Sequence, residues 1–241
     1  DGGTYLVLEL LQGESLAARL DRVKRMRPAD ALQCVIPVMR ALAAAHAGGV
    51  VHRDIKPDNV FMHRPAGGGQ RPGEGPSSIE VVKLLDFGVA KVIDSTRSQA
   101  TATGVVVGTP YYMAPEQAEG RSDVGYACDV WSVGVMLYEC LSGVLPYTAH
   151  SPMGVLVAIM TKKPRPLVQV DPTLPPALCA AIDRAMRFAP EERWGSMAEF
   201  HDALVEVLRS IASADASYLT LLGAQTKPAA MAAMMAPATS S

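Results

Sequence analysis

Aromatic side chains are scarce in this sequence: Phe, Trp and Tyr make up 5% of its 241 residues, although 49% of the residues are apolar. The interior must therefore be built from Leu, Val, Ala and Met, which suits packed helices better than a β-sandwich. An excess of positive charge is also missing, because 22 Lys and Arg face 24 Asp and Glu and leave a formal net charge of −2. This balance excludes a broad basic surface that would recruit nucleic acid or anionic lipid.

Cysteine pairs and long apolar runs are missing as well. The four cysteines, Cys34, Cys128, Cys140 and Cys179, form no C-x-x-C pair, and three of them lie in apolar helical stretches. This pattern argues against a zinc site or a disulfide framework and favours small buried groups in a reducing compartment. No apolar run approaches the ~20 residues that span a bilayer, and no cleavable signal is recognisable. We therefore expect a cytoplasmic chain without a membrane segment; the alternative is the cytoplasmic domain of a larger or membrane-anchored protein.

Hydrophobic periodicity predicts a mainly helical chain. The expected helices cover residues 16–26, 31–47, 127–141, 153–160, 177–186 and 197–212, and short strands are expected at 5–11, 60–62 and 79–85. Pro37 predicts a kink or a later start in the second helix. The helix at 127–141 is apolar on nearly all sides, so it should be buried and end at Gly143. The Gly- and Pro-rich residues 65–78 are interpreted as a surface insertion between two hairpin strands, and residues 214–241 as a disordered tail.

Three short strings carry the chemistry. They are HRDIKPDN at residues 52–59, DFG at 86–88 and GTPYYMAPE at 108–116. Phosphoryl transfer needs a carboxylate beside the attacking hydroxyl, and Asp54 fits that role. It also needs hard oxygen ligands for Mg²⁺, which Asn59 and Asp86 can supply, and a cation near the transferred group, for which Lys56 is placed. An Asx turn is the structural alternative for Asp54 and Asn59 taken singly, whereas three strings in this order favour the catalytic interpretation.

The strings follow the order H-R-D-x-x-x-x-N, D-F-G and A-P-E, and residues 5 to about 212 resemble the Hanks-type serine/threonine kinases, particularly bacterial ones. The resemblance implies ATP-dependent phosphoryl transfer to Ser or Thr of a protein substrate, with ATP and Mg²⁺ (or Mn²⁺) as cofactors. Lys56 and Thr109 resemble the residues at the matching positions of the serine/threonine branch of the family, in which the threonine bonds to the catalytic aspartate. A small-molecule phosphotransferase of the same fold is less favoured, because residues 108–116 look suited to a protein substrate.

The resemblance also implies regulatory and structural residues. Arg53 marks kinases whose activation loop is ordered by phosphorylation, and Thr101 and Thr103 resemble the phosphoacceptor positions; unmodified loop threonines are the alternative. Self-association for this phosphorylation is a further expectation. Asp129 is expected to brace the backbone of the catalytic loop.

Other matches concern packing and the nucleotide. Glu116 is expected to pair with Arg193 in a buried ion pair. Glu9 and Leu11 align with the hinge that meets adenine, and Phe61 with the adenine floor, although core packing of Phe61 is nearly as plausible.

One part of the family pattern is missing. Nothing before Tyr5 can supply a G-x-G-x-x-G loop, the strand lysine or the helix glutamate of the small lobe, and the sequence starts without methionine. We therefore expect an α+β chain: a mainly helical kinase C-lobe at 14–213, with a short β-hairpin at the catalytic loop (52–59) and an activation segment at 86–116. Residues 1–13 would be a remnant of the N-lobe, which is otherwise absent. Such a chain should bind ATP poorly and transfer little phosphate. The competing hypothesis is a truncated, inactive kinase-like scaffold that binds proteins.

Overall fold

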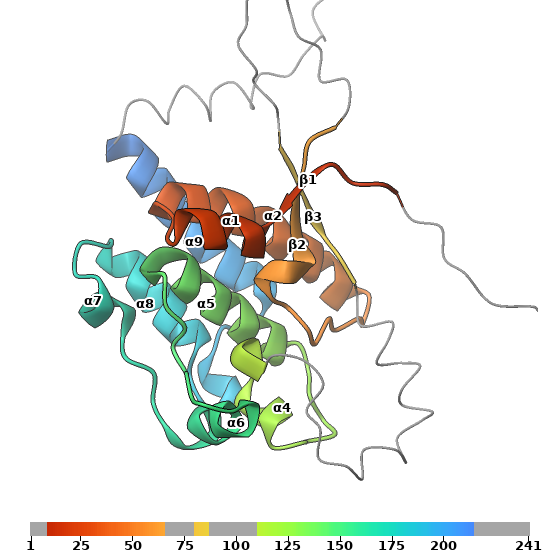
Figure 1. Ribbon diagram of the computed structural model, residues 1–241, viewed down its shortest axis with the longest axis vertical. Helices are drawn as coiled ribbons and strands as arrows, with labels where there is room; N and C mark the ends of the chain where they lie inside the picture. The colour runs from red at the N-terminus through yellow and green to blue at the C-terminus, as the bar shows by residue number, and fades with distance from the viewer. Residues whose placement is uncertain (1–8, 66–79, 87–109, 215–241) are drawn as a thin grey trace, which may run out of the picture.

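The computed structural model describes residues 9–65, 80–86 and 110–214 (Figure 1). Its helices are α1 Leu16–Val23, α2 Pro28–Ala47, α4 Pro115–Ala118, α5 Ala127–Ser142, α6 Pro152–Thr161, α7 Leu167–Val170, α8 Pro176–Ala185 and α9 Met197–Ala214. Short 3₁₀ turns lie at η1 Pro57–Asn59, η2 Pro110–Tyr112 and η3 Pro190–Glu192, and the strands are β1 Gly13–Ser15, β2 Val60–His63 and β3 Val81–Leu84. The predicted insertion, disordered tail, DFG residues 87–88 and threonines 101, 103 and 109 lie outside the described residues, except for Pro65 and Ala214 at their edges.

Helix α5 forms the centre of the molecule, as its uniformly apolar sequence predicts. Between Cys128 and Leu141 every residue except Glu139 is buried, and the helix contacts α2, α8 and α9 (Figure 1). It ends at Gly143, whose φ of 74° lies in the left-handed region that glycine adopts at low cost. A Cβ at this position would also approach the carbonyl oxygen of Lys24 to 2.9 Å. The predicted end of this helix is therefore confirmed.

The strands β1, β2 and β3 form one antiparallel sheet in that order. The predicted hairpin is present, with Val60 opposite Leu84 and Phe61 opposite Lys83. The third strand, β1, was not predicted, because three residues are too few to show an alternating pattern. Its pairing with β2 requires glycine at position 13, where φ is 137° and a Cβ would lie 2.0 Å from the carbonyl oxygen of Met62.

The helix boundaries differ from the sequence predictions mainly near the N-terminus. Helix α2 begins at Pro28, three residues before the predicted start, and Pro37 lies inside it, so the predicted later start is wrong. Proline suits the first turn because the amide hydrogen it lacks would have no partner there. Helix α1 ends at Val23 rather than near Met26, and residues 9–11, the described part of the predicted strand 5–11, form no strand.

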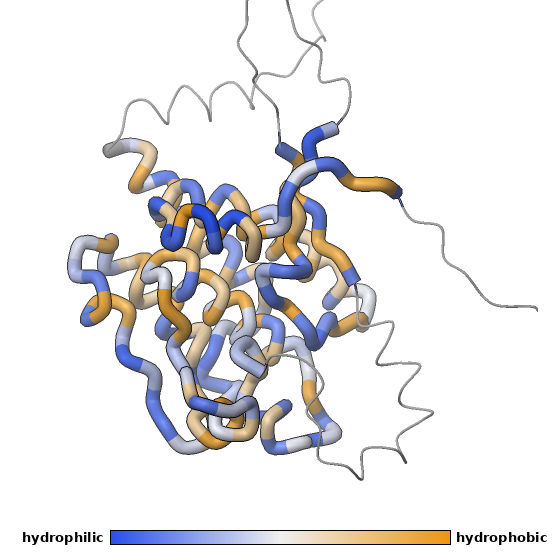
Figure 2. The backbone as a smooth tube through the Cα atoms, viewed as in Figure 1, coloured by the Kyte–Doolittle hydropathy of each residue, from blue (hydrophilic) through white to orange (hydrophobic). Residues whose placement is uncertain are grey.

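The distribution of polar residues fits a helical lobe with one interior. Figure 2 shows polar residues on the outer helix α1, of which only Leu16 and Leu20 are buried. All four cysteines are buried and free, in agreement with their interpretation as small core residues. Among the residues that the structure describes, no helix has the length and apolar character needed to cross a membrane.

Candidate active site

The loop of residues 52–59 connects α2 to β2 and is fixed from below by Asp129 of helix α5. The carboxylate of Asp129 is fully buried and accepts the backbone N–H groups of His52 at 2.9 Å and Arg53 at 2.8 Å. It also contacts Nε2 of His46, near the end of α2, at 2.8 Å. Buried backbone donors need such partners, so Asp129 sets the path of the loop. This is the bracing contact that the sequence predicted.

Asp54, Lys56 and Asn59 meet at the end of this loop. Lys56 Nζ donates to Asp54 Oδ2 at 3.0 Å, and Asn59 Nδ2 donates to the backbone oxygen of Asp54 at 2.8 Å and to its Oδ2 at 3.3 Å. Asn59 is buried, whereas the Asp54 side chain is 42% exposed. The carboxylate is thus oriented by two donors and still reachable by an incoming hydroxyl, as a general base requires.

His52 joins this loop to the strand that leads to Asp86. Its Nδ1 accepts the backbone N–H of Asp54 at 3.3 Å, so its Nε2 carries the proton and donates to the backbone oxygen of Leu85 at 3.0 Å. The backbone N–H of Leu85 in turn donates to the backbone oxygen of Asn59 at 2.8 Å. One fully buried imidazole therefore links the segment that carries Asp54 to the residue preceding Asp86.

Two residues at this site adopt backbone conformations that are uncommon for side chains other than glycine. The φ angles are 65° for Arg53 and 51° for Asp86. Residues in the left-handed region cost about 1–3 kcal/mol and persist where surrounding contacts hold them. Here those contacts are the Asp129 bond to Arg53 and the Leu85 bond to Asn59, on either side of the candidate site.

The donor set fits a hard divalent cation bound together with a nucleotide. The amide nitrogen of Asn59 donates to Asp54, so the amide oxygen is the atom left to bind a metal. The Asp86 carboxylate follows strand β3, which pairs with strand β2 directly after Asn59. Within the described residues, no group of three or more His, Cys, Asp or Glu side chains could hold a metal. Phosphate and water oxygens would therefore complete the coordination, an arrangement typical of Mg²⁺ rather than of a structural metal.

The end of the predicted activation segment is attached to the same loop. Gln117 of α4 donates through Nε2 to the backbone oxygen of Arg53 at 3.0 Å, and its Oε1 accepts the backbone N–H of Ala114 at 3.1 Å. The exposed Arg53 guanidinium donates to the backbone oxygen of Val124 at 3.1 Å. Its expected partners, Thr101 and Thr103, lie outside the described residues.

The expected ion pair between Glu116 and Arg193 is present and buried. Arg193 Nη1 and Nη2 bind the two carboxylate oxygens at 2.7 and 2.8 Å. The remaining donors of the guanidinium reach the backbone oxygens of Ala127, Arg187 and Phe188 at 2.8 to 2.9 Å. All five N–H groups of Arg193 are thus satisfied, which is the condition under which a buried charge is tolerated.

A small cavity lies beside Asp54. It is bordered by Arg53, Asp54, Lys56, Tyr112 and Ser132, among others. Tyr112 donates to Glu139 Oε2 of α5 at 2.6 Å. Burial is the main cause that raises the pKa of the Glu139 carboxyl above its ordinary value, and the hydrogen bond from Tyr112 partly opposes it. Tyr112, which lines the cavity, is therefore anchored to the partly buried carboxyl of Glu139 behind it.

The residues expected to contact adenine lie beside the sheet. Glu9 is exposed and forms an ion pair with Lys83 of β3, and His63 lies 3.7 Å from its other carboxylate oxygen. Leu11 is half-buried, and Phe61 of β2 is half-buried with its ring 3.4 Å from the position of a Cβ on Gly13. These positions leave both the adenine and the packing interpretation of Phe61 open.

Sequence reasoning missed three residues that hold the site together, namely His46, His52 and Gln117. The sequence assigned no role to His52, the histidine of the HRD string, because the function of a fully buried polar residue is recognised only once its partners are known. Gln117 directly follows the A-P-E string and offered no separate signal.

A helical lobe that carries a short antiparallel sheet and an HRD loop braced from its central helix defines the class of protein kinases. The sequence model described as "Protein kinase domain" matches residues 1–205, so the chain belongs to the protein kinase family.

The similar curated proteins are bacterial serine/threonine kinases. Serine/threonine-protein kinase Pkn1 of Myxococcus xanthus is 39% identical over 231 residues, which cover 95% of this chain and 30% of Pkn1. PksC of Streptomyces coelicolor is 39% identical over 236 residues, or 95% of this chain and 39% of PksC. PknA of Mycobacterium tuberculosis is 38% identical over 203 residues, or 84% and 42%. The chain thus spans less than half the length of these relatives.

Proposed function

We propose that this chain carries the catalytic centre of an ATP-dependent serine/threonine protein kinase. The observation that carries the proposal is the convergence of Asp54, Lys56 and Asn59 within hydrogen-bonding distance, on a loop whose backbone is fixed by Asp129. Names of the bacterial relatives support the same activity. Its substrates are proteins with an accessible Ser or Thr. We place the reaction in the cytoplasm.

The roles follow from the chemistry of phosphoryl transfer. Asp54 would accept the proton of the substrate hydroxyl as the oxygen attacks the γ-phosphorus of ATP, while the bond from this phosphorus to the β–γ bridging oxygen breaks and ADP leaves. Lys56, which contacts the same carboxylate, offsets charge on the transferred group once substrate separates the two side chains. Mg²⁺ supplies charge neutralisation of the phosphates when bound, and Asn59 and Asp86 are the residues that would hold it. Thr109 would orient Asp54 from the activation segment.

Substitution of Asp54 tests the proposal. In the intact protein, Asp54→Asn should lower kcat by about 10²–10⁴ because the base is lost while the shape of the side chain is kept. The KM for ATP and the unfolding free energy should stay unchanged. The matched control is Asp202→Asn on α9, an acid whose side chain is 81% exposed and distant from the loop. Transfer of radiolabelled phosphate at the wild-type rate by Asp54→Asn would contradict the proposal.

The metal assignment is tested by binding rather than by turnover. Asp86→Asn should weaken calorimetric binding of ATP in the presence of Mg²⁺ and have little effect in its absence, because the carboxylate acts through the metal. An equal loss of affinity in both conditions would assign Asp86 a structural role instead.

A finer part of the proposal concerns these 241 residues as an isolated polypeptide. Without a glycine-rich loop and its lysine, phosphates are covered on one side only, and we predict weak ATP binding and little phosphoryl transfer. Radiolabel transfer by the purified polypeptide, compared with its Asp54→Asn form, measures this. Robust activity above that control would show the prediction to be wrong, and it would equally exclude the inactive-scaffold hypothesis.

A further inference from the structure

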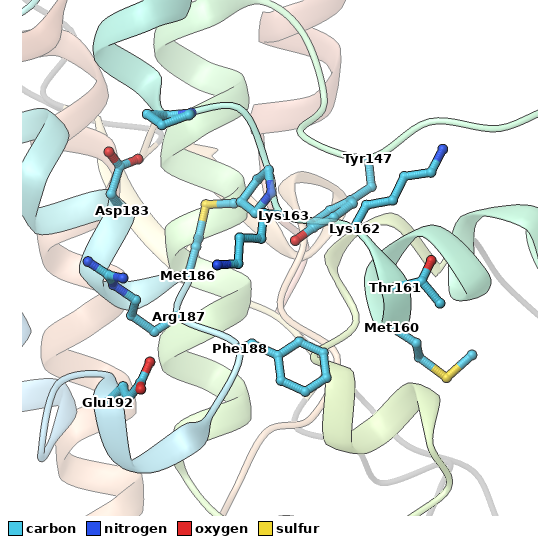
Figure 3. A pocket seen from close by; sticks show the side chains of 12 residues that line it. Tyr147, Met160, Thr161, Lys162, Lys163, Asp183, Met186, Arg187, Phe188 and Glu192 are labelled. Carbon is cyan, nitrogen blue, oxygen red and sulfur yellow. The ribbon is translucent and has the colours of Figure 1, made fainter.

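A second cavity lies away from Asp54, between the ends of α6 and α8. It has a volume of about 460 Å³, within the range of ligand-binding pockets. Figure 3 shows its lining, with Asp183, Arg187 and Glu192 on one side, Met160 and Thr161 on the other, and Phe188 between them. None of these residues belongs to the catalytic loop or contacts it through a described hydrogen bond.

The pocket wall is held in place by contacts to the core. The hydroxyl of Tyr138 on α5 donates to the backbone oxygen of Arg165 at 3.0 Å, and Arg165 donates to the backbone oxygen of Gln169 at 2.7 Å. On the opposite wall, the backbone oxygens of Arg187 and Phe188 accept hydrogen bonds from Arg193. A pocket that is already ordered binds a peptide without the entropic cost of forming the site.

The charges of the pocket are distributed unevenly. Asp183 accepts the backbone N–H of Leu167 at 3.2 Å. Burial raises the pKa of the Asp183 carboxyl, and the Leu167 hydrogen bond and the charge of Arg187 partly oppose this effect. Arg187 lines the pocket together with two carboxylates, those of Asp183 and Glu192. Lys162 and Lys163 are exposed, and neither forms an ion pair with any other residue in the described part of the chain. The end of the pocket beside α6 thus carries an excess of positive charge that a carboxylate could neutralise.

An apolar surface adjoins these lysines. Phe188 is 49% exposed at the pocket, and on α6 Met153 and Val157 are about half exposed at positions one helical turn apart. The ten residues of α6 include no charged side chain. The same helix packs against α4 and η2, which border the catalytic loop and its cavity. Exposed apolar residues beside a basic pocket are characteristic of an interaction surface.

We propose that this pocket is a docking site for an acidic segment of the protein substrate, with an apolar anchor residue against Phe188 and carboxylates at Lys162 and Lys163. The inference rests on the proposed kinase function, since it names the partner of that activity. The cationic side chains of the lining, two lysines and Arg187, outnumber its two carboxylates, so the lysine end determines the preferred charge of the partner.

The binding test uses fluorescence anisotropy with short labelled peptides and the intact protein, without ATP. Each peptide carries one Leu or Phe flanked by Glu, by Gln or by Lys. The Glu series should bind best, and Lys162→Glu with Lys163→Glu should weaken it about tenfold or more, as loss and reversal of two charge pairs implies. Lys24→Glu with Arg40→Glu, which changes the net charge equally at exposed sites outside the pocket, should have no effect beyond about twofold.

Three results would overturn the proposal: no peptide binding below about 1 mM, equal binding of Glu and Lys peptides, or equal loss of affinity in the control variant. Because the assay needs no phosphoryl transfer, it is repeated in Asp54→Asn, and binding there is independent of whether the chain is a kinase. A kinetic arm then tests the link to substrate. Attaching the Glu peptide to a phosphorylatable peptide should lower KM and leave kcat unchanged in wild type, and should change neither in the lysine variant.

Discussion

The residues proposed to react and the residues that hold their loop in place have opposite surroundings. Asp54 and Lys56 are 42% and 27% exposed and contact each other, whereas Asp129 and Arg193 are 0% and 1% exposed and have every polar group engaged. An exposed ion pair such as Asp54 with Lys56 contributes little to stability and changes partners easily. A buried charged group whose polar atoms all have partners is held in one position. The comparison teaches that the positions of the loop residues are set by helix α5 and its partners, whereas the proposed catalytic side chains are the more exposed and more weakly held groups.

The largest expected effect on stability is loss of the buried guanidinium. Arg193→Ala leaves Glu116 as an unpaired buried charge and orphans three carbonyl oxygens, so the unfolding free energy should fall by about 3–5 kcal/mol. Urea unfolding measures this change. Arg121→Ala, which removes an exposed ion pair with Asp123 of the same 2.7 Å length, should leave stability unchanged. Equal effects of the two substitutions would show that burial does not distinguish the two regions.

An intermediate effect is expected at the brace of the catalytic loop. Asp129→Asn replaces one acceptor oxygen by an amide that faces a backbone N–H of His52 or Arg53, at a cost of about 1–3 kcal/mol. Because the loop is displaced, kcat should fall about 10²-fold with the KM for ATP nearly constant. Steady-state kinetics and urea unfolding together test this prediction. A variant that loses stability but keeps its kcat would break the proposed link between the brace and the reacting carboxylate.

The smallest expected effect is a pH dependence of stability at Glu139, which lies between the exposed residues of the catalytic loop and the buried residues of helix α5. The pKa of Glu139 in the folded protein is raised above 4.5, mainly by burial. At pH values between the unfolded-state pKa and this higher folded-state pKa, the folded protein keeps a proton that the unfolded chain releases. Its contribution to stability is therefore complete below pH 4.5 and is lost as pH rises through the folded-state pKa. Across that window the unfolding free energy of wild type should fall relative to Glu139→Gln by up to about 1.4 kcal/mol per pH unit. Parallel pH profiles of the two proteins would contradict it.

The sequence predicted best where a pattern is long or a string is specific. Helix α5 was predicted to within a residue, because its apolar run and Gly143 are strong signals. The pair of Glu116 and Arg193 followed from the resemblance to kinases, which relates positions 77 residues apart that no periodicity connects. The domain boundaries stay predictions, and so do the catalytic, nucleotide-binding, metal-binding and regulatory roles of individual residues, namely Glu9, Leu11, Arg53, Asp54, Lys56, Asn59, Phe61, Asp86, Thr101, Thr103 and Thr109.

Contacts made by single atoms could not be predicted. The tautomer of His52 depends on two backbone groups from different segments, Asp54 and Leu85. Strand β1 depends on a glycine that lets three residues approach Met62, a tertiary contact without a sequence period. The pocket beside Lys163 arises where two helices end near each other, and its residues are ordinary surface residues in the sequence.

The five hydrogen bonds of Arg193 also bear on how the protein opens locally. One side chain joins α4, the start of α5 and the turn after α8, so detachment of any one segment leaves buried donors of Arg193 without a partner and weakens the attachment of the other two. In native-state hydrogen exchange, amides of the three segments should report one common opening energy, and they should exchange as a single cooperative unit. A protein partner seated beside Phe188 would then slow amide exchange around Glu116 as well, without touching it.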